Sequence, residues 1–183
     1  LNDWYIYSDL KNTRSYREFM ILNYLHKYNF NTCKPLVGWV TYSGLLYKAN
    51  LVTEAIPAIT LCEFLAKISA DNEDDSFLNK TISKYERPQL FKEIGVKVAQ
   101  MHRLNIFHGD LNINNIMISG DPINSGNAKI WILDFDKSLM KPLKEKDRKL
   151  NLNRFKKSLI KNKQYLRFDY ETFLSSYFSV INS

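Results

Sequence analysis

The sequence predicts an α+β fold in two lobes: a small lobe of antiparallel strands plus one helix, and a larger, mainly helical lobe. Two observations predict it. One helix and a pair of strands come before a linking segment, and helical patterns dominate after it. Within the helical part, isoleucines alternate on either side of a Gly/Ser/Asn-rich loop at residues 119–127, as in a β-hairpin. These isoleucines are Ile116, Ile118, Ile130 and Ile132. We assign residues 1–56 to a partial small lobe with its hinge, and residues 57–183 to the larger lobe.

The small lobe is predicted to start with an apolar, aromatic stretch at residues 1–8, which is the end of a strand or a packed loop. Residues 13–28 follow as a helix, in which Ser15 and Glu18 have the Ser-x-x-Glu spacing of a capping box. One face of this helix is apolar and comprises Phe19, Leu22 and Leu25.

Two strands are predicted next, at residues 36–42 and 45–53, joined by the turn pair Ser43-Gly44. The segment after them has two interpretations. It either merely ends the second strand, or it is a hinge between the two lobes. The residues of this segment are Thr53, Glu54, Ala55 and Ile56.

In the larger lobe, residues 61–68 are predicted to form a short helix, and the polar residues 71–87 a solvated surface loop. Pro88 fits the first turn of a helix that runs to about Leu104. Its buried side comprises Phe91, Ile94, Val98 and Met101. A last amphipathic helix carries a stripe of side chains predicted to belong to the core: Tyr170, Phe173, Leu174, Tyr177, Phe178 and Ile181.

Composition limits the class of protein. The 183 residues are 45% hydrophobic, which suits a chain that buries a core, and the net charge of +7 suits an anionic partner. No apolar run is long enough to span a bilayer, and no signal peptide is visible. Because the first residue is Leu1 and not methionine, we expect the chain to begin inside a longer gene product. Cys33 and Cys62 show no metal or redox spacing and are predicted to be buried thiols in a reducing compartment.

The chemistry is indicated by His-Gly-Asp-Leu-Asn-Ile-Asn-Asn at residues 108–115, followed after the hairpin by Asp-Phe-Asp at residues 134–136. Each Asp or Asn alone is typical of a turn or cap, because its side chain bonds nearby backbone. Together they provide a base and two metal ligands, which phosphoryl transfer requires. The hairpin would fold Asp134 back beside Asn115 and Asp110. The order of these residues matches the catalytic and metal-binding segments of the protein-kinase-like fold.

Several stretches resemble one family within that fold, the 3-deoxy-D-manno-octulosonic acid (Kdo) kinases of the lipopolysaccharide kinase group. They are His-Gly-Asp-Leu-Asn at 108–112, Asp-Phe-Asp-Lys at 134–137, Asn-Leu-Asn-Arg-Phe-Lys-Lys-Ser-Leu at 151–159, Asn-Thr-Arg-Ser-Tyr-Arg-Glu-Phe at 12–19, and Gly-Leu-Leu-Tyr-Lys-Ala-Asn-Leu at 44–51. The resemblance covers almost the whole chain. It implies ATP-dependent phosphorylation of a Kdo sugar on lipid A, by a protein bound peripherally to the cytoplasmic face of the inner membrane. It implies no nucleic-acid partner, and the oligomeric state has no signature in the sequence.

The resemblance also implies residue roles. Asp110 resembles the catalytic base, while Asn115 and Asp134 resemble the ligands of an ATP-bound Mg²⁺. His108 belongs to the same catalytic segment, where we interpret it as orienting the loop by hydrogen bonding. Asn112 lies where protein kinases often carry a lysine that contacts the γ-phosphate, which argues against a typical Ser/Thr protein kinase.

On the nucleotide side, Glu18, Thr53, Glu54 and Ile56 are the expected ATP-binding residues. Glu18 either pairs with a phosphate-binding lysine on a strand or caps its own helix at the Ser15 N–H. Neither that lysine nor a Gly-x-Gly-x-x-Gly loop is found in the sequence, so we expect a truncated N-terminal lobe that binds nucleotide poorly as written.

We expect Phe135 to pack under the helix that carries Glu18. Asp136 replaces the usual Gly, which makes a flipping activation segment doubtful.

Two alternatives to a Kdo kinase stay open at this point. One is another small-molecule phosphotransferase of the aminoglycoside type, although its acceptor site would be acidic and this C-terminal part is basic. The other is a non-catalytic kinase-like module that binds anionic membrane or nucleic acid. The basic stretch after Pro142 suits an acidic acceptor, and Lys137, Lys144, Arg148 and Arg154 are candidates to hold it.

Overall fold

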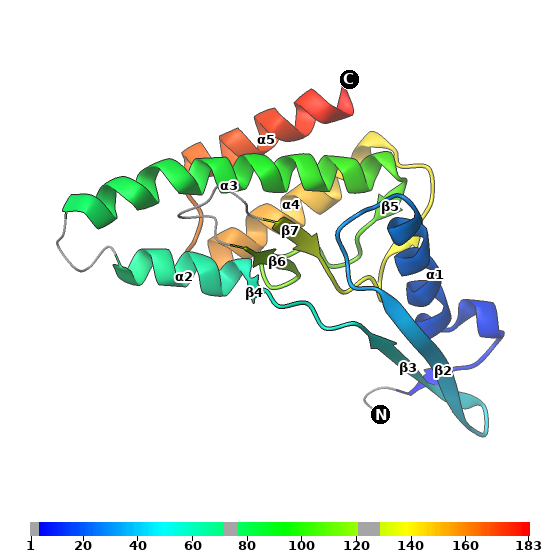
Figure 1. The fold of residues 1–183 in the computed structure, drawn as a ribbon. Helices are drawn as coiled ribbons and strands as arrows, with labels where there is room; N and C mark the ends of the chain where they lie inside the picture. The colour runs from blue at the N-terminus through cyan, green and yellow to red at the C-terminus, as the bar shows by residue number, and fades with distance from the viewer. Residues whose placement is uncertain (1–3, 72–76, 121–128) are drawn as a thin grey trace.

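The computed structural model describes residues 4–71, 77–120 and 129–183, and of residues 69–71 and 77–86 the backbone alone. Two long helices, α3 and α5, lie side by side, and the β6–β7 hairpin and α4 lie alongside them (Figure 1). Helix α1 and a small sheet form the opposite end of the molecule. This division agrees with the predicted α+β fold in two lobes, and the boundary at residues 56 and 57 stays a prediction.

The small lobe contains one antiparallel sheet with the strand order β1-β3-β2. Its elements are β1 (Tyr5–Ile6), a 3-10 turn η1 (Leu10–Asn12), α1 (Arg14–Lys27), β2 (Pro35–Ser43) and β3 (Leu46–Thr53). The predicted helix and both predicted strands are confirmed. The turn is one residue later than predicted, because Ser43 pairs with Leu46 and the two turn residues are therefore Gly44 and Leu45. Gly44 has a φ of +59°, which favours glycine at the first turn position.

The capping box predicted at the start of α1 is wrong. The cap residue is Thr13, whose hydroxyl donates to the Leu10 carbonyl at 2.6 Å. The Ser15 hydroxyl instead donates to the carbonyl of Trp39 on β2 at 3.3 Å. Glu18 accepts the backbone N–H of Phe135, which is distant in the sequence. Tertiary partners therefore replace the local bonds that the Ser-x-x-Glu spacing suggested.

The larger lobe contains four helices and two small sheets within the described residues. Its elements are β4 (Ile59–Thr60), α2 (Leu61–Asp71), α3 (Phe77–Arg103), β5 (Ile106–Phe107), β6 (Ile116–Ser119), β7 (Lys129–Ile132), β8 (Leu139–Met140), α4 (Glu145–Lys161) and α5 (Arg167–Ile181). The strand orders are β4-β6-β7 and β5-β8. The predicted hairpin is confirmed, since Ile116 pairs with Ile132 and Ile118 with Ile130.

The predicted surface loop at residues 71–87 is wrong at Asp71, which ends α2, and from Phe77 onward, where α3 begins. Residues 72–76 lie outside the described part. Pro88 lies inside this helix and not in its first turn. The side chain of Arg87 is buried and forms an ion pair with Asp169 of α5. The helix therefore runs through a polar sequence and a proline that the residue pattern alone excludes, and Arg87 fixes its middle against the start of α5.

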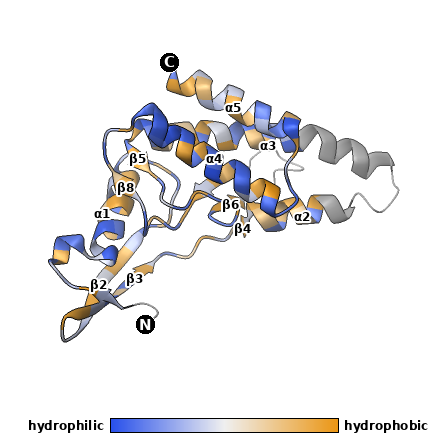
Figure 2. Cartoon of the chain, turned by 180° about the vertical axis from the view of Figure 1, so that it is seen from behind, coloured by the Kyte–Doolittle hydropathy of each residue, from blue (hydrophilic) through white to orange (hydrophobic). Residues whose placement is uncertain are grey.

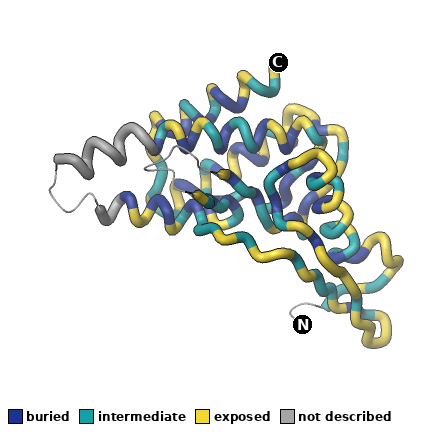
Figure 3. The backbone as a smooth tube through the Cα atoms, viewed as in Figure 1, coloured by how far each residue is buried: buried dark blue, intermediate teal, exposed yellow. Residues whose placement is uncertain are grey.

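The core lies between α3, α5, the hairpin and the inner side of α1, as the dark blue tube in Figure 3 shows. The predicted core face of α3 is confirmed, because Phe91, Ile94, Val98 and Met101 are fully buried. On α5 the prediction holds for three aromatic side chains, but Phe178 is 47% exposed because it lies on the outer side of the helix. The buried ones are Tyr170, Phe173 and Tyr177.

Strand β2 is exposed over most of its length (Figure 3), and hydrophilic residues colour much of α4, which carries the basic stretch (Figure 2). Cys33 and Cys62 are free thiols, but both are half-buried and not fully buried as predicted, because each lies at the margin of the core. No helix in the described residues is both long enough and apolar enough to cross a membrane.

Candidate active site

The loop between β5 and β6, residues 108–115, is called the catalytic loop here, and His108 fixes its first turn. The imidazole is fully buried and packs against the Phe135 ring, with ring centres 4.8 Å apart. Its Nε2 lies 2.9 Å from the Leu133 carbonyl, so that nitrogen carries the proton. Its Nδ1 accepts the Asp110 backbone N–H at 3.1 Å. Burial lowers the pKa of His108 to about 4, so the ring is neutral at pH 7. This geometry suits the orienting role predicted for it.

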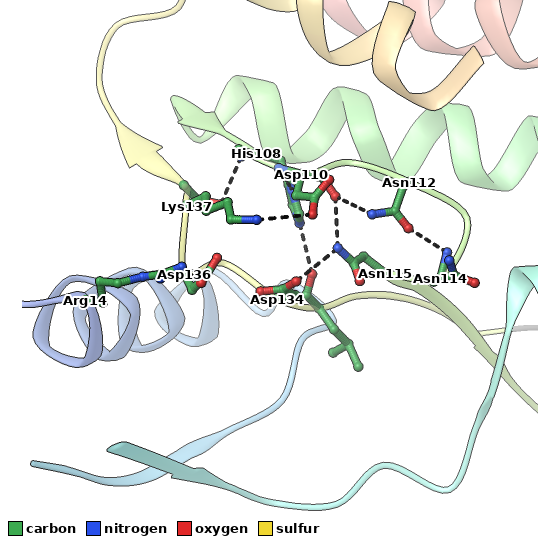
Figure 4. Close-up of polar contacts among 12 residues, drawn as sticks. Arg14, His108, Asp110, Asn112, Asn114, Asn115, Asp134, Asp136 and Lys137 are labelled. Carbon is green, nitrogen blue, oxygen red and sulfur yellow. Dashed lines mark hydrogen bonds and ion pairs between the residues drawn. The ribbon is translucent and has the colours of Figure 1, made fainter. Parts of the chain in front are cut away.

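Asp110 presents its carboxylate at the surface of this loop (Figure 4). The carboxylate is 43% exposed, and the Lys137 ammonium lies 3.7 Å from it. The backbone carbonyl of Asp110 points inward and accepts the side-chain amides of Asn112, at 3.0 Å, and Asn115, at 2.9 Å. Asn112 also accepts the Asn114 backbone N–H at 2.8 Å. The side chain of Asn112 therefore stabilises the turn of the loop, whereas the Asp110 carboxylate is open to a substrate.

Asn115 and Asp134 meet as predicted. The Asn115 Nδ2 donates to the Asp134 Oδ2 at 3.2 Å, and the Asn115 backbone carbonyl accepts the Leu133 N–H at 2.9 Å (Figure 4). Asp134 has a φ of +64°, a conformation that Asp tolerates better than most residues and that is common at functional sites. The Asn115 amide bonds both Asp110 and Asp134, so the three predicted residues converge at one place.

The donor set at Asn115 and Asp134 fits Mg²⁺. Among the described residues, no donor bonds the Asn115 Oδ1, so this oxygen and the Asp134 carboxylate are available as ligands. An amide oxygen and a carboxylate are hard ligands, and Mg²⁺ commonly takes only one or two protein ligands while phosphates and water supply the others. The described residues contain no cluster of three or more His, Cys, Asp or Glu side chains that would form an all-protein metal cage.

The segment after Asp134 runs very close to the catalytic loop. The Gly109 N–H donates to the Ser138 hydroxyl at 3.3 Å. A Cβ atom on Gly109 would lie 2.1 Å from the Lys137 carbonyl oxygen. Only glycine fits at this close approach, because the obstacle is backbone and cannot rotate away. Position 109 therefore places Lys137 beside Asp110.

Helix α1 holds the same segment from the other side. The Glu18 carboxylate accepts the Phe135 N–H at 3.2 Å, and the Phe135 side chain is fully buried. Packing of its ring under α1 stays a prediction. Burial, followed by the charge of Asp134, raises the pKa of Glu18 to about 7. Arg14, one turn earlier, forms an ion pair with Asp136. The other oxygen of Asp136 is buried and has no hydrogen-bond donor among the described residues. The residue that replaces the usual Gly is thus held by α1.

Sequence reasoning missed Arg14 and Lys48. Both line a cavity of about 330 Å³ together with Glu18 and Asp136. The spacing of four residues between Arg14 and Glu18 places both on one face of α1 and was available as a signal. Lys48 on β3 had no signal, because its position depends on how the sheet packs against the helix.

The predicted hinge, residues 53–56, makes no hydrogen bond or ion pair with the catalytic loop within the described ranges. Residues 54–58 form neither helix nor strand, and Thr53 ends β3. The Glu54 N–H donates to the Lys34 carbonyl at 2.9 Å, and its carboxylate lies 3.3 Å from the Lys34 ammonium. The Ile56 carbonyl accepts the Ala58 N–H. The role of the hinge residues in binding ATP therefore stays a prediction.

Part of the basic stretch after Pro142 has structural partners. Lys149 lies 2.6 Å from Glu145. The Arg154 guanidinium lies over the Phe107 ring, 5.8 Å from its centre. Of the four candidates for an acidic acceptor, Lys137 is the one that contacts the predicted base.

Comparison with solved structures defines the class of protein. The fold matches WaaP, solved in complex with acyl carrier protein, with a TM-score of 0.71 and 16% identity over 90% of this chain and 66% of that one. It also matches the Rio2 kinase of Chaetomium thermophilum, with a TM-score of 0.52 and 14% identity over 93% of this chain and 50% of that one. The chain therefore has a protein-kinase-like fold.

Sequence comparison defines the family. The model of the lipopolysaccharide kinase (Kdo/WaaP) family matches residues 1–177, and the chain belongs to this family. The 3-deoxy-D-manno-octulosonic acid kinase of Vibrio cholerae is 33% identical over 96% of this chain and 67% of that protein. The enzyme of the same name from Vibrio vulnificus (strain YJ016) is 34% identical over 75% of this chain and 49% of that protein. The chain thus spans between half and two thirds of these relatives. The resemblance noted in the sequence is confirmed.

Proposed function

We propose that this protein is an ATP-dependent kinase that phosphorylates a Kdo residue of Kdo-lipid A during lipopolysaccharide core synthesis. The observation that carries the proposal is the convergence of Asp110, Asn115 and Asp134 through the Asn115 side chain. Relatives named 3-deoxy-D-manno-octulosonic acid kinase support the choice of acceptor. The alternative of an aminoglycoside-type enzyme has no comparable support among these relatives.

In this proposal Asp110 accepts the proton of the sugar hydroxyl as that oxygen attacks the γ-phosphorus of ATP. Its carboxylate is exposed enough to meet a substrate, and the Lys137 ammonium lies 3.7 Å from it. Asn115 and Asp134 would hold Mg²⁺, which supplies neutralisation of the phosphate charge when bound. His108 stays neutral and holds the loop, and Asn112 stabilises its turn.

On the nucleotide side, Glu18 and the segment containing Thr53, Glu54 and Ile56 are proposed to contact ATP, directly or through a phosphate-binding cation. The cavity that Glu18 shares with Arg14 and Lys48 supports this, because it places two cations beside Glu18. Because Arg14 is already paired with Asp136, Lys48 is the cation in this cavity that we propose to contact a nucleotide phosphate.

The acceptor side is proposed to face an anionic membrane. Kdo carries a carboxylate and lipid A carries phosphates, so exposed lysines near Asp110 would attract both. Each lysine close to an anionic surface contributes about 1 kcal/mol. We therefore propose a peripheral location on the cytoplasmic face of the inner membrane, where Lys137, Lys144 and Arg154 would meet the lipid headgroups. The Nε of Arg148, the fourth candidate, is instead buried.

The test uses the full-length protein, radiolabelled ATP and Kdo-lipid A. We expect phosphate transfer that requires Mg²⁺ and that Asp110→Ala reduces by at least about 10³-fold, because the base is lost. We expect Asp134→Asn to raise the KM for MgATP. Exposed Asp9, changed to Ala, provides a matched control that keeps full activity. Undiminished transfer by Asp110→Ala would refute the assignment of the base.

A further inference from the structure

Helix α4 presents one face to the catalytic loop. Asn151, Phe155 and Ser158 follow one another at spacings of four and three residues, so they lie on the same side of the helix. Phe155 is fully buried and anchors this face, with its ring centre 6.3 Å from that of Phe91 and 4.9 Å from that of Phe173. The two polar residues on either side of Phe155 therefore have fixed positions. Both belong to the 151–159 stretch that carries part of the family resemblance.

Asn151 holds the start of the catalytic loop. Its side chain is fully buried, its Oδ1 accepts the His108 backbone N–H at 3.0 Å, and its Nδ2 donates to the His108 carbonyl at 2.7 Å. Because both partners are backbone groups of one residue, the orientation of the amide is determined. Both hydrogen-bonding groups of the His108 main chain are thus satisfied by one side chain.

A buried network in turn holds Asn151. The His102 Nε2 lies 3.0 Å from the Asn151 Oδ1, which can only accept, so His102 donates from that nitrogen. The other ring nitrogen then accepts the Tyr177 hydroxyl at 2.7 Å. Burial lowers the pKa of His102 to about 4, which keeps this network neutral. The chain of bonds runs from α5 through α3 and α4 to the catalytic loop.

Ser158 holds the catalytic loop at Ile113. Its hydroxyl donates to the Phe155 carbonyl at 2.8 Å, which leaves a lone pair that accepts the Ile113 N–H at 3.2 Å. The Ile113 carbonyl accepts the Cys62 N–H of α2 at 3.2 Å. Asp110 thus lies between two residues of the loop, His108 and Ile113, whose backbones are bonded to the same face of α4.

We infer that Asn151 and Ser158 are positioning residues, which fix the catalytic loop so that the Asp110 carboxylate is held where it meets the acceptor hydroxyl. The expected effect on kcat rests on the proposed function, whereas the fixed position of the loop does not. Proton transfer depends on distance, and a displacement of about 1 Å lowers a rate by about 10²-fold. Neither residue contacts the expected positions of ATP or sugar, so nucleotide binding does not require them.

The test compares Asn151→Ala and Ser158→Ala in the full-length protein. Asn153→Ala is the matched control, because it is an exposed Asn on the same helix two residues away. We expect kcat to fall about 10- to 100-fold in Asn151→Ala and several-fold in Ser158→Ala, while the KM for MgATP stays within about a factor of two. Amide hydrogen exchange should accelerate at His108 in the first variant and at Ile113 in the second. Exchange within α3 should not change.

The outcomes separate this inference from the proposed function. Exchange needs no substrate, so unchanged protection at residues 108–113 in both variants would overturn the inference alone. Unchanged kcat in both variants, with Asp110→Ala inactive, would also overturn it and leave the proposed function intact. If Asn151→Ala does not fold, Ser158→Ala decides, because its side chain is only half-buried and its loss leaves the core in place. A rise in KM with an unchanged kcat would assign these residues to binding and contradict positioning.

Discussion

The two segments that form the candidate site are held in opposite ways. The catalytic loop is attached to α3, α4 and α5 by neutral, buried hydrogen bonds that run through His102, Asn151 and His108. The Asp-Phe-Asp segment is attached to α1 by charged groups at its half-exposed edge, where Glu18 meets Phe135 and Arg14 meets Asp136. A neutral network is insensitive to salt but fails when its histidines must take up a proton. A charged attachment responds to both salt and pH.

The pH responses of the two segments have opposite signs. The histidines have folded pKa values of about 4, below the ordinary value of 6.5, so folding loses stability as the pH falls below 6.5. Glu18 has a folded pKa of about 7, above the ordinary value of 4.5, so its contribution falls as the pH rises from 4.5 to 7. Acidification therefore weakens the attachment of the catalytic loop while it strengthens that of the metal-side segment.

The largest effect is expected from replacing a buried histidine, which should remove part of the pH dependence of the neutral network. At pH 5, each buried histidine that stays neutral costs the folded protein about 2 kcal/mol of stability relative to pH 7. His102→Gln keeps a donor for Asn151 but does not titrate. We expect the loss of unfolding free energy between pH 7 and pH 5, measured by urea denaturation, to shrink by about 2 kcal/mol in this variant. A pH dependence identical to that of the unmodified protein would show that His102 is not held neutral.

A smaller effect is expected at the charged attachment. Arg14→Leu leaves the mostly buried carboxylate of Asp136 without its cation, and we expect a loss of about 1–2 kcal/mol in unfolding free energy. The loss should be smaller in 1 M salt, because salt already weakens the pair. Arg17→Leu on the exposed side of the same helix is the control and should change little. An equal loss in both variants would mean that the contribution of Arg14 is not the ion pair.

The smallest effect sharpens the comparison through Glu18. Glu18→Gln keeps an oxygen for the Phe135 N–H but removes the charge whose burial is unfavourable. The full shift of the Glu18 pKa from 4.5 to about 7 corresponds to about 3 kcal/mol at pH 8. Because this side chain is only half-buried and solvent screens its charge, in EDTA at pH 8 we expect the variant to be more stable than the unmodified protein by about 1 kcal/mol, and equally stable near pH 4, where Glu18 is protonated. Thermal unfolding at both pH values measures this difference. Destabilisation by Glu18→Gln at pH 8 would contradict the raised pKa.

Sequence predictions succeeded where a local pattern determines the contact and failed where the contact joins residues far apart in the sequence. The meeting of Asn115 and Asp134 was predictable, because the alternating isoleucines fix the register of the hairpin that joins them. The partner of Glu18 was not, because its bond to Phe135 spans 117 residues and no local pattern encodes it. The helical state of the residues before Pro88 was also missed, and the burial of Arg87 against Asp169 has no trace in a polar sequence. Asn151 lies in a stretch that carries the family resemblance, but its bonds to His108 could not be predicted, because the two residues are 43 positions apart in the sequence.

The backbone contact at Gly109 limits which residue this chain can carry beside the proposed base. Any larger residue there would displace the carbonyl of position 137, and trimming the side chain of that neighbour would not relieve the clash. Lys137 itself projects into solvent and is open to replacement. A mutant library aimed at new sugars should therefore leave codon 109 untouched and diversify codon 137, where charge and length can vary without moving the main chain.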